Sequence, residues 1–237
     1  MKPTDALVPP EAVGAVPSST DDLMSCADWL NVSHSVMKLA EAIFGVNPGQ
    51  WYVDRIIGNW SAYGRAGSAM VNLGKFYTAY GQTLAEQKNV LMTSWHGHAA
   101  TAADAYFANL ADAIKAQQDS LTQIGEELHG IAYRMWTLSK LLDSQLELLL
   151  DVVLEAFLAA AVGTATVETG VGAVAGYALA ALRIKKAESI WMSIIEAHDK
   201  AYNYFLASRA VISAAMTKMR TLTEHPLPQG AYDHPGV

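Results

Sequence analysis

His96 and His98, which flank Gly97, are the first residues of this chain whose types and spacing suggest chemistry, because imidazole nitrogens bind transition metals. A zinc site needs three or four ligands, and no carboxylate or thiol lies near this pair in the sequence. The chain has a single cysteine, Cys26, which excludes an internal disulfide and any site built from several cysteines. We therefore expect a solvated turn here, with no bound metal and no other cofactor.

A carboxylate and a histidine at helical spacing, Glu126 and His129, form half of the pattern that holds two metal ions inside a helical bundle. Such a site needs a second copy of the pattern, and the sequence contains none. No set of serine, histidine and aspartate stands out for nucleophilic catalysis. Cys26 falls on an amphipathic segment, where we expect a small core residue rather than a nucleophile. These residues therefore predict no catalytic site.

Acidic residues recur at intervals of four in one segment, at Asp143, Glu147, Asp151 and Glu155. This spacing places them on one face of a helix, where like charges repel weakly and burial is disfavoured. A solvated face is the simpler interpretation, and a docking strip for a basic partner is the alternative.

His129 and His198 are candidates for titration chemistry. They fall at comparable depth if the two segments that carry them fold back on each other near residues 163–170. Two histidines that face each other would make a contact sensitive to pH. The alternative is that both histidines face water.

The composition limits the class of protein. Apolar residues make up 51% of the 237 residues and charged residues only 16%, which excludes a disordered chain and indicates extensive burial or contact with lipid. The net charge of -7 argues against nucleic acid as a partner, since phosphate binding needs a basic face. The first residues hold one lysine with no apolar run behind it, so we expect no cleaved signal peptide.

The prolines indicate where long helices can form. None lies within residues 49–225, and an uninterrupted helix needs such a stretch because proline costs about 3 kcal/mol inside one. No window alternates as a strand does. The apolar spacing predicts helices at about 21–44, 51–93, 99–160 and 173–222.

Two further local signals refine this prediction. Ser19 and Asp22 fit a capping box at the start of the first helix, and Gly58–Trp60 suggest an irregularity in the second. The ends, 1–18 and 224–237, hold most of the prolines and are predicted to be flexible tails.

We expect an all-α fold, an elongated antiparallel bundle that forms a single domain over residues 19–223. A first hairpin is expected at about 50–145, and a second at about 120–222 with an apolar tip at 156–182.

Apolar residues at steps of three and four mark the faces on which these helices are expected to pack. Trp136 lies beside this seam, and we expect it and the aromatic seam residues to be core or interface residues without a ligand. The predicted seam residues are Ile56, Trp60, Tyr63, Met70, Leu73, Tyr77, Tyr80, Leu84 and Leu91, then Phe107, Leu110, Ile114, Leu121, Ile124, Leu128, Ile131, Met135, Leu138 and Leu142, then Ala187, Trp191, Ile194, His198, Ala201 and Phe205.

The segment 156–182 has one charged residue, Glu168. Its roughly 27 residues would be enough to span a bilayer, but a turn is predicted at 169–172, which divides the run into pieces too short to cross. We expect an apolar tip that packs on itself or on a partner, with reversible membrane insertion or a permanent anchor as alternatives. Its glycines include Gly163 and a Gly-x-x-x-Gly pair suited to close helix approach, Gly172 and Gly176.

The residues between the second and third predicted helices are the most informative. Two long apolar stripes separated by so few residues fold back most simply as an antiparallel hairpin. Gly97 tolerates a positive φ, and Ser94 or Thr101 is expected to accept the orphan amide hydrogens of the helix that follows. Trp95 then lies at the extreme end, where one face of the indole can close the bundle while the other stays in water.

Trp95 and Gly97, followed by small residues through Ala103, resemble the signature of the Trp-x-Gly hairpin superfamily. This superfamily comprises substrates and targeting domains of type VII (ESX-type) secretion in actinobacteria and their relatives. The resemblance covers about residues 45–220.

Three further segments look like the longer actinobacterial members, which include N-terminal trafficking domains of polymorphic toxins. Those members more often carry an acidic residue where this chain has Asn59. The segments are Val46–Pro48, Gly58–Trp60 and Ala69–Leu73.

The resemblance implies a non-enzymatic protein, cytoplasmic before export, that is secreted folded or displayed at the cell surface by the type VII machinery. It implies a helical protein partner or a homo-oligomer, with Trp95 and Gly97 recognised by the partner or the secretion ATPase. None of the ten tyrosines begins the family's export signal, Tyr-x-x-x-Asp/Glu, because none has an acidic residue four positions later. We expect a partner, or a variant in the tail after Leu222, to supply it.

Two other functions remain open from the sequence. One is a membrane-active protein that inserts the 156–182 hairpin to perforate or tether a bilayer. The other is a helical scaffold that stays in the cytosol.

Overall fold

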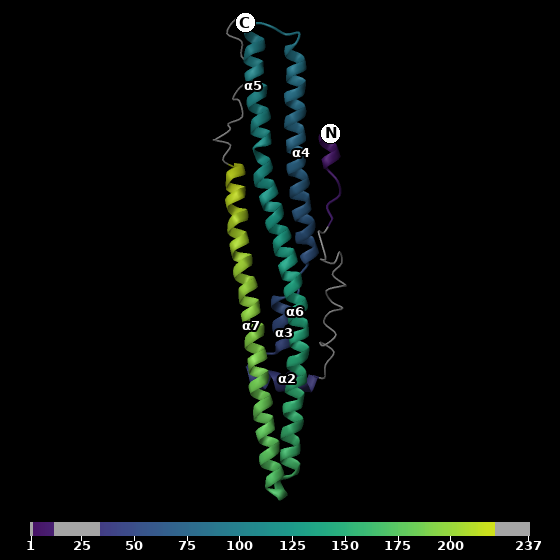
Figure 1. Ribbon diagram of the computed structural model, residues 1–237, viewed down its shortest axis with the longest axis vertical. Coiled ribbons are helices and arrows are strands. Elements are labelled where there is room, and N and C mark those ends of the chain that lie inside the picture. Colours follow the sequence, from purple (N-terminus) through teal and green to yellow (C-terminus); the bar gives the residue numbers. More distant parts are fainter. Residues whose placement is uncertain (1, 12–33, 221–237) are drawn as a thin grey trace. The chain divides into compact units, whose positions relative to one another are not determined.

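The computed structural model describes residues 2–11 and 34–220, and its regular elements are all helical (Figure 1). The predicted all-α fold is confirmed, and no strand occurs in the described ranges. In chain order the elements are η1 (Pro3–Ala6), α2 (His34–Phe44), α3 (Pro48–Arg55), α4 (Trp60–Met92), α5 (His98–Lys115), α6 (Gln117–Ala165), η3 (Val167–Thr169) and α7 (Val171–Arg220).

Two predicted helices are each divided in two. The predicted helix at 51–93 is split into α3 and α4, and the one at 99–160 is split into α5 and α6 at Ala116. The predicted helix at 173–222 corresponds to α7. The start predicted at Asp21, the Ser19–Asp22 capping box, Cys26 and the tail 224–237 lie outside the described residues.

The break between α3 and α4 has a local cause. The Trp60 ring folds back over Gly58, so that a Cβ on this glycine would lie 2.8 Å from the ring. The indole Nε1 donates to the carbonyl of Ile56, 3.2 Å away. Asn47 starts α3, since its side-chain oxygen accepts from the amide of Gln50 at 3.0 Å. The irregularity predicted at Gly58–Trp60 is therefore a complete interruption.

The chain groups into two compact units, where the sequence predicts one domain over 19–223. Of the described residues, 2–11, 61–132 and 205–220 form the first unit, and 34–60 and 133–204 form the second. One part of α6 and one part of α7 therefore belong to each unit.

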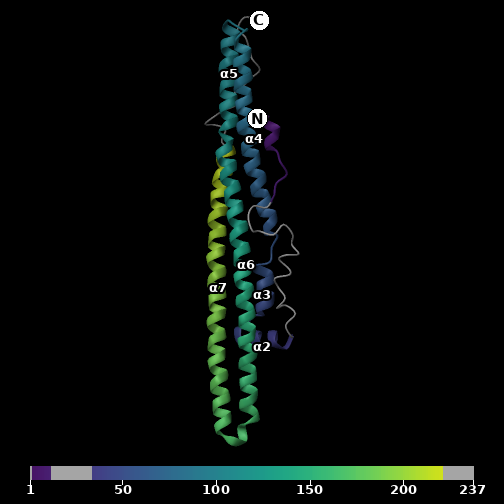
Figure 2. The same ribbon diagram turned by 45° about the vertical axis from the view of Figure 1, so that its right-hand side comes forward.

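In the first unit, α4 and α5 run antiparallel and lie side by side (Figures 1 and 2). The close approach of α4 to its neighbours depends on glycine. A Cβ on Gly67 would lie 2.7 Å from the Gly125 carbonyl oxygen, and one on Gly81 would lie 3.0 Å from that of Ala111. Gly74, midway between them, also packs against α6. Seven-residue spacing keeps the three glycines on one face of α4.

The seam predicted for α4 is therefore wrong in part, since Met70, Leu73, Tyr77 and Leu84 are half-buried. Tyr63, Tyr80 and Leu91 are exposed, whereas the buried positions of α4 are occupied by glycine, alanine and serine. Small residues let the backbones approach, and the larger side chains are displaced to the flanks of the contact. In the first part of α6 the predicted seam is confirmed, with Leu121 and Ile124 buried.

Residues 2–11, part of the segment predicted to be a flexible tail, lie along α4. Ala6 is buried. The Ser68 hydroxyl donates to the Glu11 carbonyl at 2.6 Å, and the Asn72 side-chain amide donates to that of Val8 at 3.3 Å. Two side chains of α4 thus hold backbone groups of the N-terminal segment.

In the second unit, α6 and α7 form an antiparallel hairpin closed by η3, and α2 and α3 pack against it (Figure 2). Rings from three helices meet here, because Trp191 of α7 stacks on Phe44 at 5.4 Å and meets Trp51 edge-on at 5.3 Å. The Tyr52 hydroxyl donates to the buried carbonyl of Ser139 at 3.2 Å. The predicted seam residues Met135, Leu138, Leu142, Ala187, Trp191 and Ile194 are buried as expected.

Candidate functional site

The turn between α4 and α5 is built as the sequence predicts around Gly97. This residue has φ +103° and ψ −177°, a conformation that L side chains rarely adopt. α4 ends at Met92, and the Trp95 amide still donates to the Leu91 carbonyl at 3.2 Å, so this tryptophan lies directly after the last turn of the helix. The antiparallel hairpin predicted around residues 95–97 is confirmed.

The Trp95 side chain is half-buried, while His96, Gly97 and His98 are exposed. The ring is thus neither sealed inside the helices nor fully in water. The two histidines take the solvated positions predicted for them.

The predicted caps of this turn are wrong. The Thr101 hydroxyl donates to the Gly97 carbonyl at 3.2 Å and the Ser94 hydroxyl donates to the Leu91 carbonyl, so neither accepts an amide hydrogen of α5. Gly97 itself occupies the N-cap position. Both hydroxyls stabilise carbonyl groups near the turn instead.

An ion pair fixes the register of α4 and α5 near the turn. Lys88 Nζ lies 2.6 Å from Asp104 Oδ1, and the lysine side chain is only 14% exposed. A largely desolvated ammonium needs its carboxylate partner. The pair therefore holds the end that carries Trp95 in one geometry.

Ser68 and His129 form a serine–histidine contact in the first unit, with Oγ and Nε2 3.1 Å apart. The serine hydroxyl already donates its hydrogen to the Glu11 carbonyl. The histidine must then be the donor in the contact, and it cannot act as the base that would activate this serine. The arrangement therefore does not support nucleophilic catalysis by Ser68.

His198 belongs to the second unit and has its own partners. Its Nδ1 lies 3.1 Å from Asp199 Oδ1, and its ring meets Trp51 edge-on and stacks on Tyr202. His129 contacts Ser68 in the first unit. Each histidine thus has a hydrogen-bond partner of its own, and these contacts do not support a pH-sensitive pair between His129 and His198.

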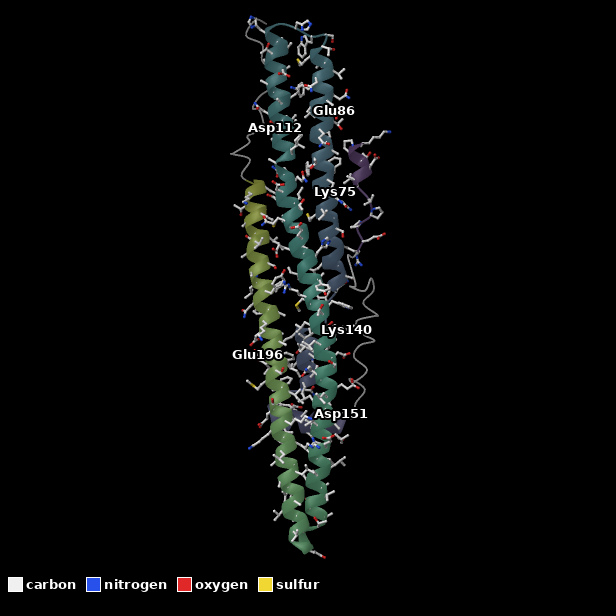
Figure 3. The ribbon with its side chains drawn as sticks, in the orientation of Figure 1. Lys75, Glu86, Asp112, Lys140, Asp151 and Glu196 are labelled. Atoms are coloured by element: carbon white, nitrogen blue, oxygen red, sulfur yellow. The ribbon has the colours of Figure 1, made fainter. Side chains whose placement is uncertain are left out.

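The acidic face of α6 is solvated, as the simpler interpretation predicts. Glu147, Asp151 and Glu155 are exposed and Asp143 is half-buried. Figure 3 labels Asp151 together with other charged side chains that are also exposed: Lys75, Glu86, Asp112, Lys140 and Glu196.

The apolar tip, defined as residues 156–182, is a tight helical hairpin. Gly170, with φ +65°, ends η3, and α7 begins at the next residue. Gly176 packs directly on Gly163, where its Cβ would lie 2.5 Å from the backbone of α6. The close approach that the sequence suggested for Gly172 and Gly176 is thus made between Gly163 and Gly176. Gly172 instead lines a groove with Leu158, Val162 and Leu179.

Large apolar side chains of the tip are exposed on both arms, and Glu168 is exposed at the turn. Within the described residues one helical stretch, inside His98–Ala165, is long and apolar enough to cross a membrane, with 39% of its apolar window buried. The core helix of a soluble protein passes the same test of length and composition.

A second groove, which sequence reasoning missed, lies between α6 and α7 in the second unit. Arg134 lies 3.9 Å above the ring of Tyr204, and both line the groove with Glu196 and Lys200. A hydrogen bond from Lys200 and its positive charge lower the pKa of Glu196. The spacing of Arg134 and Tyr204 in the sequence gives no signal of this pairing, which depends on the register of two helices.

Among the described residues, no group of three or more metal-ligating side chains comes together. Comparison with known proteins gives no match to a family model, a curated protein or a solved structure.

Proposed function

We propose that this chain is a non-enzymatic substrate or targeting module of type VII secretion, exported folded with a helical partner. The observation that carries the proposal is the turn: α4 and α5 are antiparallel and are joined through Trp95 and Gly97, with the indole half-exposed. A half-exposed indole offers apolar area together with a hydrogen-bond donor. Tryptophan is enriched among the residues that contribute most to protein interfaces.

The flank of α4 supplies a surface that suits a helical partner. Phe76 stacks on Tyr80 at 5.9 Å and meets Tyr77 edge-on at 5.7 Å. Tyr80 is exposed and the other two rings are half-buried. Because the seam of α4 is occupied by glycine, these rings lie outside it and remain available. A helix that packs on them would bury aromatic area, and such a partner could also carry the Tyr-x-x-x-Asp/Glu signal.

Secretion of a Trp95→Ala variant tests the proposal. In a host with a type VII system, we expect the secreted fraction to fall at least tenfold relative to the native chain. The unfolding free energy should change by about 1 kcal/mol or less, because the ring is only half-buried. His96→Ala is the matched control, since it alters an exposed side chain of the same turn and should be secreted normally.

Two results would contradict the proposal. Unchanged location after deletion of the secretion ATPase would favour a cytosolic scaffold. A loss of about 3–5 kcal/mol in Trp95→Ala, as expected for a tryptophan removed from a core, would make the ring a structural plug.

A further inference from the structure

The apolar tip exposes large apolar side chains over most of its surface. They are Phe157, Leu158, Val162, Val167, Val171, Val174, Tyr177, Leu179 and Leu182. Val171 is 81% exposed and Val174 is 72% exposed. Exposed apolar area of this extent marks an interaction surface.

We propose that the apolar tip inserts into one leaflet of a lipid bilayer as a re-entrant hairpin. At about 100° per residue, Val174, Tyr177, Leu179 and Leu182 spread with Val171 over roughly 200° of α7. A helix that packs on one partner presents a stripe of only about 100°. Lipid chains surround a hairpin on every free side, so the distribution favours lipid over a single protein partner.

Three hydroxyl groups of the tip are satisfied without water. The Thr164 hydroxyl contacts the Tyr177 hydroxyl at 3.1 Å and donates to the Ala160 carbonyl. The Thr166 hydroxyl donates to the Val162 carbonyl at 2.8 Å. Hydrocarbon offers no hydrogen bonds, so a segment that enters it needs its polar groups paired internally. The hydroxyls of these three side chains meet that requirement.

The two arms pack as membrane helices do. Gly163 and Gly176 bring the backbones of α6 and α7 together, with Ala159 and Ala180 also buried. Small residues at the contact are typical of helix pairs in lipid, where close backbone packing replaces the hydrophobic effect. The large side chains are left on the outer surface, which a lipid environment would cover.

The length of the tip matches one leaflet. The arms, Ala156–Ala165 and Val171–Leu182, are about 15–18 Å long at 1.5 Å per residue. The hydrocarbon core of a bilayer is about 30 Å thick, so neither arm can cross it. The ion pair between Arg183 and Glu155, 3.1 Å apart, closes the base of the tip. Charged residues thus begin where the headgroup region would begin.

The charges at the base do not favour lipids of one charge. Lys185 and Lys186 are exposed beside Arg183 on α7, and Asp151 and Glu155 are exposed on α6. The two negative charges offset most of the three positive charges. Insertion is therefore expected into zwitterionic vesicles, driven by apolar area rather than by attraction to anionic lipid. Glu168 at the turn opposes insertion, because a charged carboxylate is costly in hydrocarbon.

Flotation of the full chain with phosphatidylcholine vesicles tests the proposal. The native chain should float with the vesicles, and Val174→Asp should lower the bound fraction at least tenfold. Val90→Asp is the matched control, because Val90 is 63% exposed on α4 and outside the tip; this variant should bind as the native chain does. Glu168→Gln should raise the partition coefficient about tenfold. Circular dichroism should give the same helical content for every variant.

The depth is measured with a fluorophore at Val174→Cys in a Cys26→Ser background. We expect a blue shift on addition of vesicles and quenching by lipids labelled along the acyl chain, with no shift for a fluorophore at Val90→Cys. Failure of the native chain to float would overturn the proposal, as would equal losses in Val174→Asp and Val90→Asp. A stable oligomer in the absence of lipid that Val174→Asp dissociates, with no vesicle binding, would assign the tip to a protein interface instead. Because these readouts need no secretion system, their failure is distinct from failure of the proposed export function.

Discussion

A Cβ on Gly176 of α7 would lie 2.5 Å from the Cα of Gly163 on α6, a separation that real side chains essentially never adopt. The atoms that would have to move are backbone atoms of α6, which cannot give way as the end of a flexible side chain can. The absence of a side chain at Gly176 therefore sets how closely the arms of the apolar tip approach.

Gly176→Ala should lower the unfolding free energy by about 1–3 kcal/mol, because the added methyl group forces the two arms apart. Gly163→Ala is the matched control. Its Cβ would lie 3.2 Å from the Tyr177 amide, and the gain of about 0.5–1 kcal/mol from replacing glycine in a helix should offset the closer contact. Urea denaturation measures both variants. Equal stability of Gly176→Ala and the native chain would mean that the arms are not packed through these glycines.

The glycines also explain which parts of the fold could be predicted from the sequence. The absence of proline and the three- and four-residue apolar steps were sufficient for helices, and leucine and isoleucine identified the buried face of α6. In α4 the same reasoning failed, because it ranks positions by how much apolar side chain they carry. The helix contact of α4 is formed by Gly67, Gly74 and Gly81 because these residues carry no side chain. The apolar spacing predicted tyrosines in the seam in their place.

The site was predictable to a similar degree. The positive φ at Gly97 follows from the shortness of the link between two helices. Only a residue without a side chain adopts this conformation easily. The hydrogen-bond partners of Ser94 and Thr101 were not predictable, since a hydroxyl can donate to a carbonyl as readily as accept from an amide. Contacts such as Arg134 on Tyr204 depend on the register between α6 and α7, which no local pattern specifies.

Asp104→Asn should destabilise the hairpin that carries Trp95. Its partner Lys88 is mostly buried while Asp104 itself is about half-exposed, so we expect a loss of about 0.5–1 kcal/mol, smaller at high salt because ions screen the exposed carboxylate. Thermal unfolding at low and high ionic strength measures the effect. Asp112→Asn is the control, because Asp112 is more exposed and lies 3.8 Å from Lys115; its stability should hardly change. A larger loss in Asp112→Asn would contradict the assignment.

Lys200→Gln should raise the pKa of Glu196 toward its ordinary value. Lys200 Nζ lies 2.7 Å from Glu196 Oε1, and this hydrogen bond, followed by the positive charge, lowers the pKa of that carboxyl. The associated stabilisation is present above the ordinary pKa of glutamate and is lost as the pH falls through the lowered value. Carboxyl carbon shifts in an NMR titration report the change directly.

Lys186→Gln serves as the control for this titration, since Lys186 lies ten residues earlier on α7, about 15 Å along the helix. It should leave the Glu196 pKa where it is in the native chain. An unchanged Glu196 titration in Lys200→Gln would show that the ion pair does not persist in solution.

Tyr52→Phe should lower the unfolding free energy by about 1 kcal/mol, the net worth of one buried hydrogen bond. The Tyr52 side chain is 2% exposed, and its hydroxyl donates to the Ser139 carbonyl. The bond joins α3, the short helix that lies before the break at Gly58, to α6. Tyr133→Phe removes a hydroxyl from a ring that is 55% exposed on α6, so it should shift the urea midpoint far less. If both variants unfold at the native midpoint, the Tyr52 hydrogen bond does not hold α3 on α6. The ring contacts of Trp51 with Trp191 and His198 would then have to position this helix.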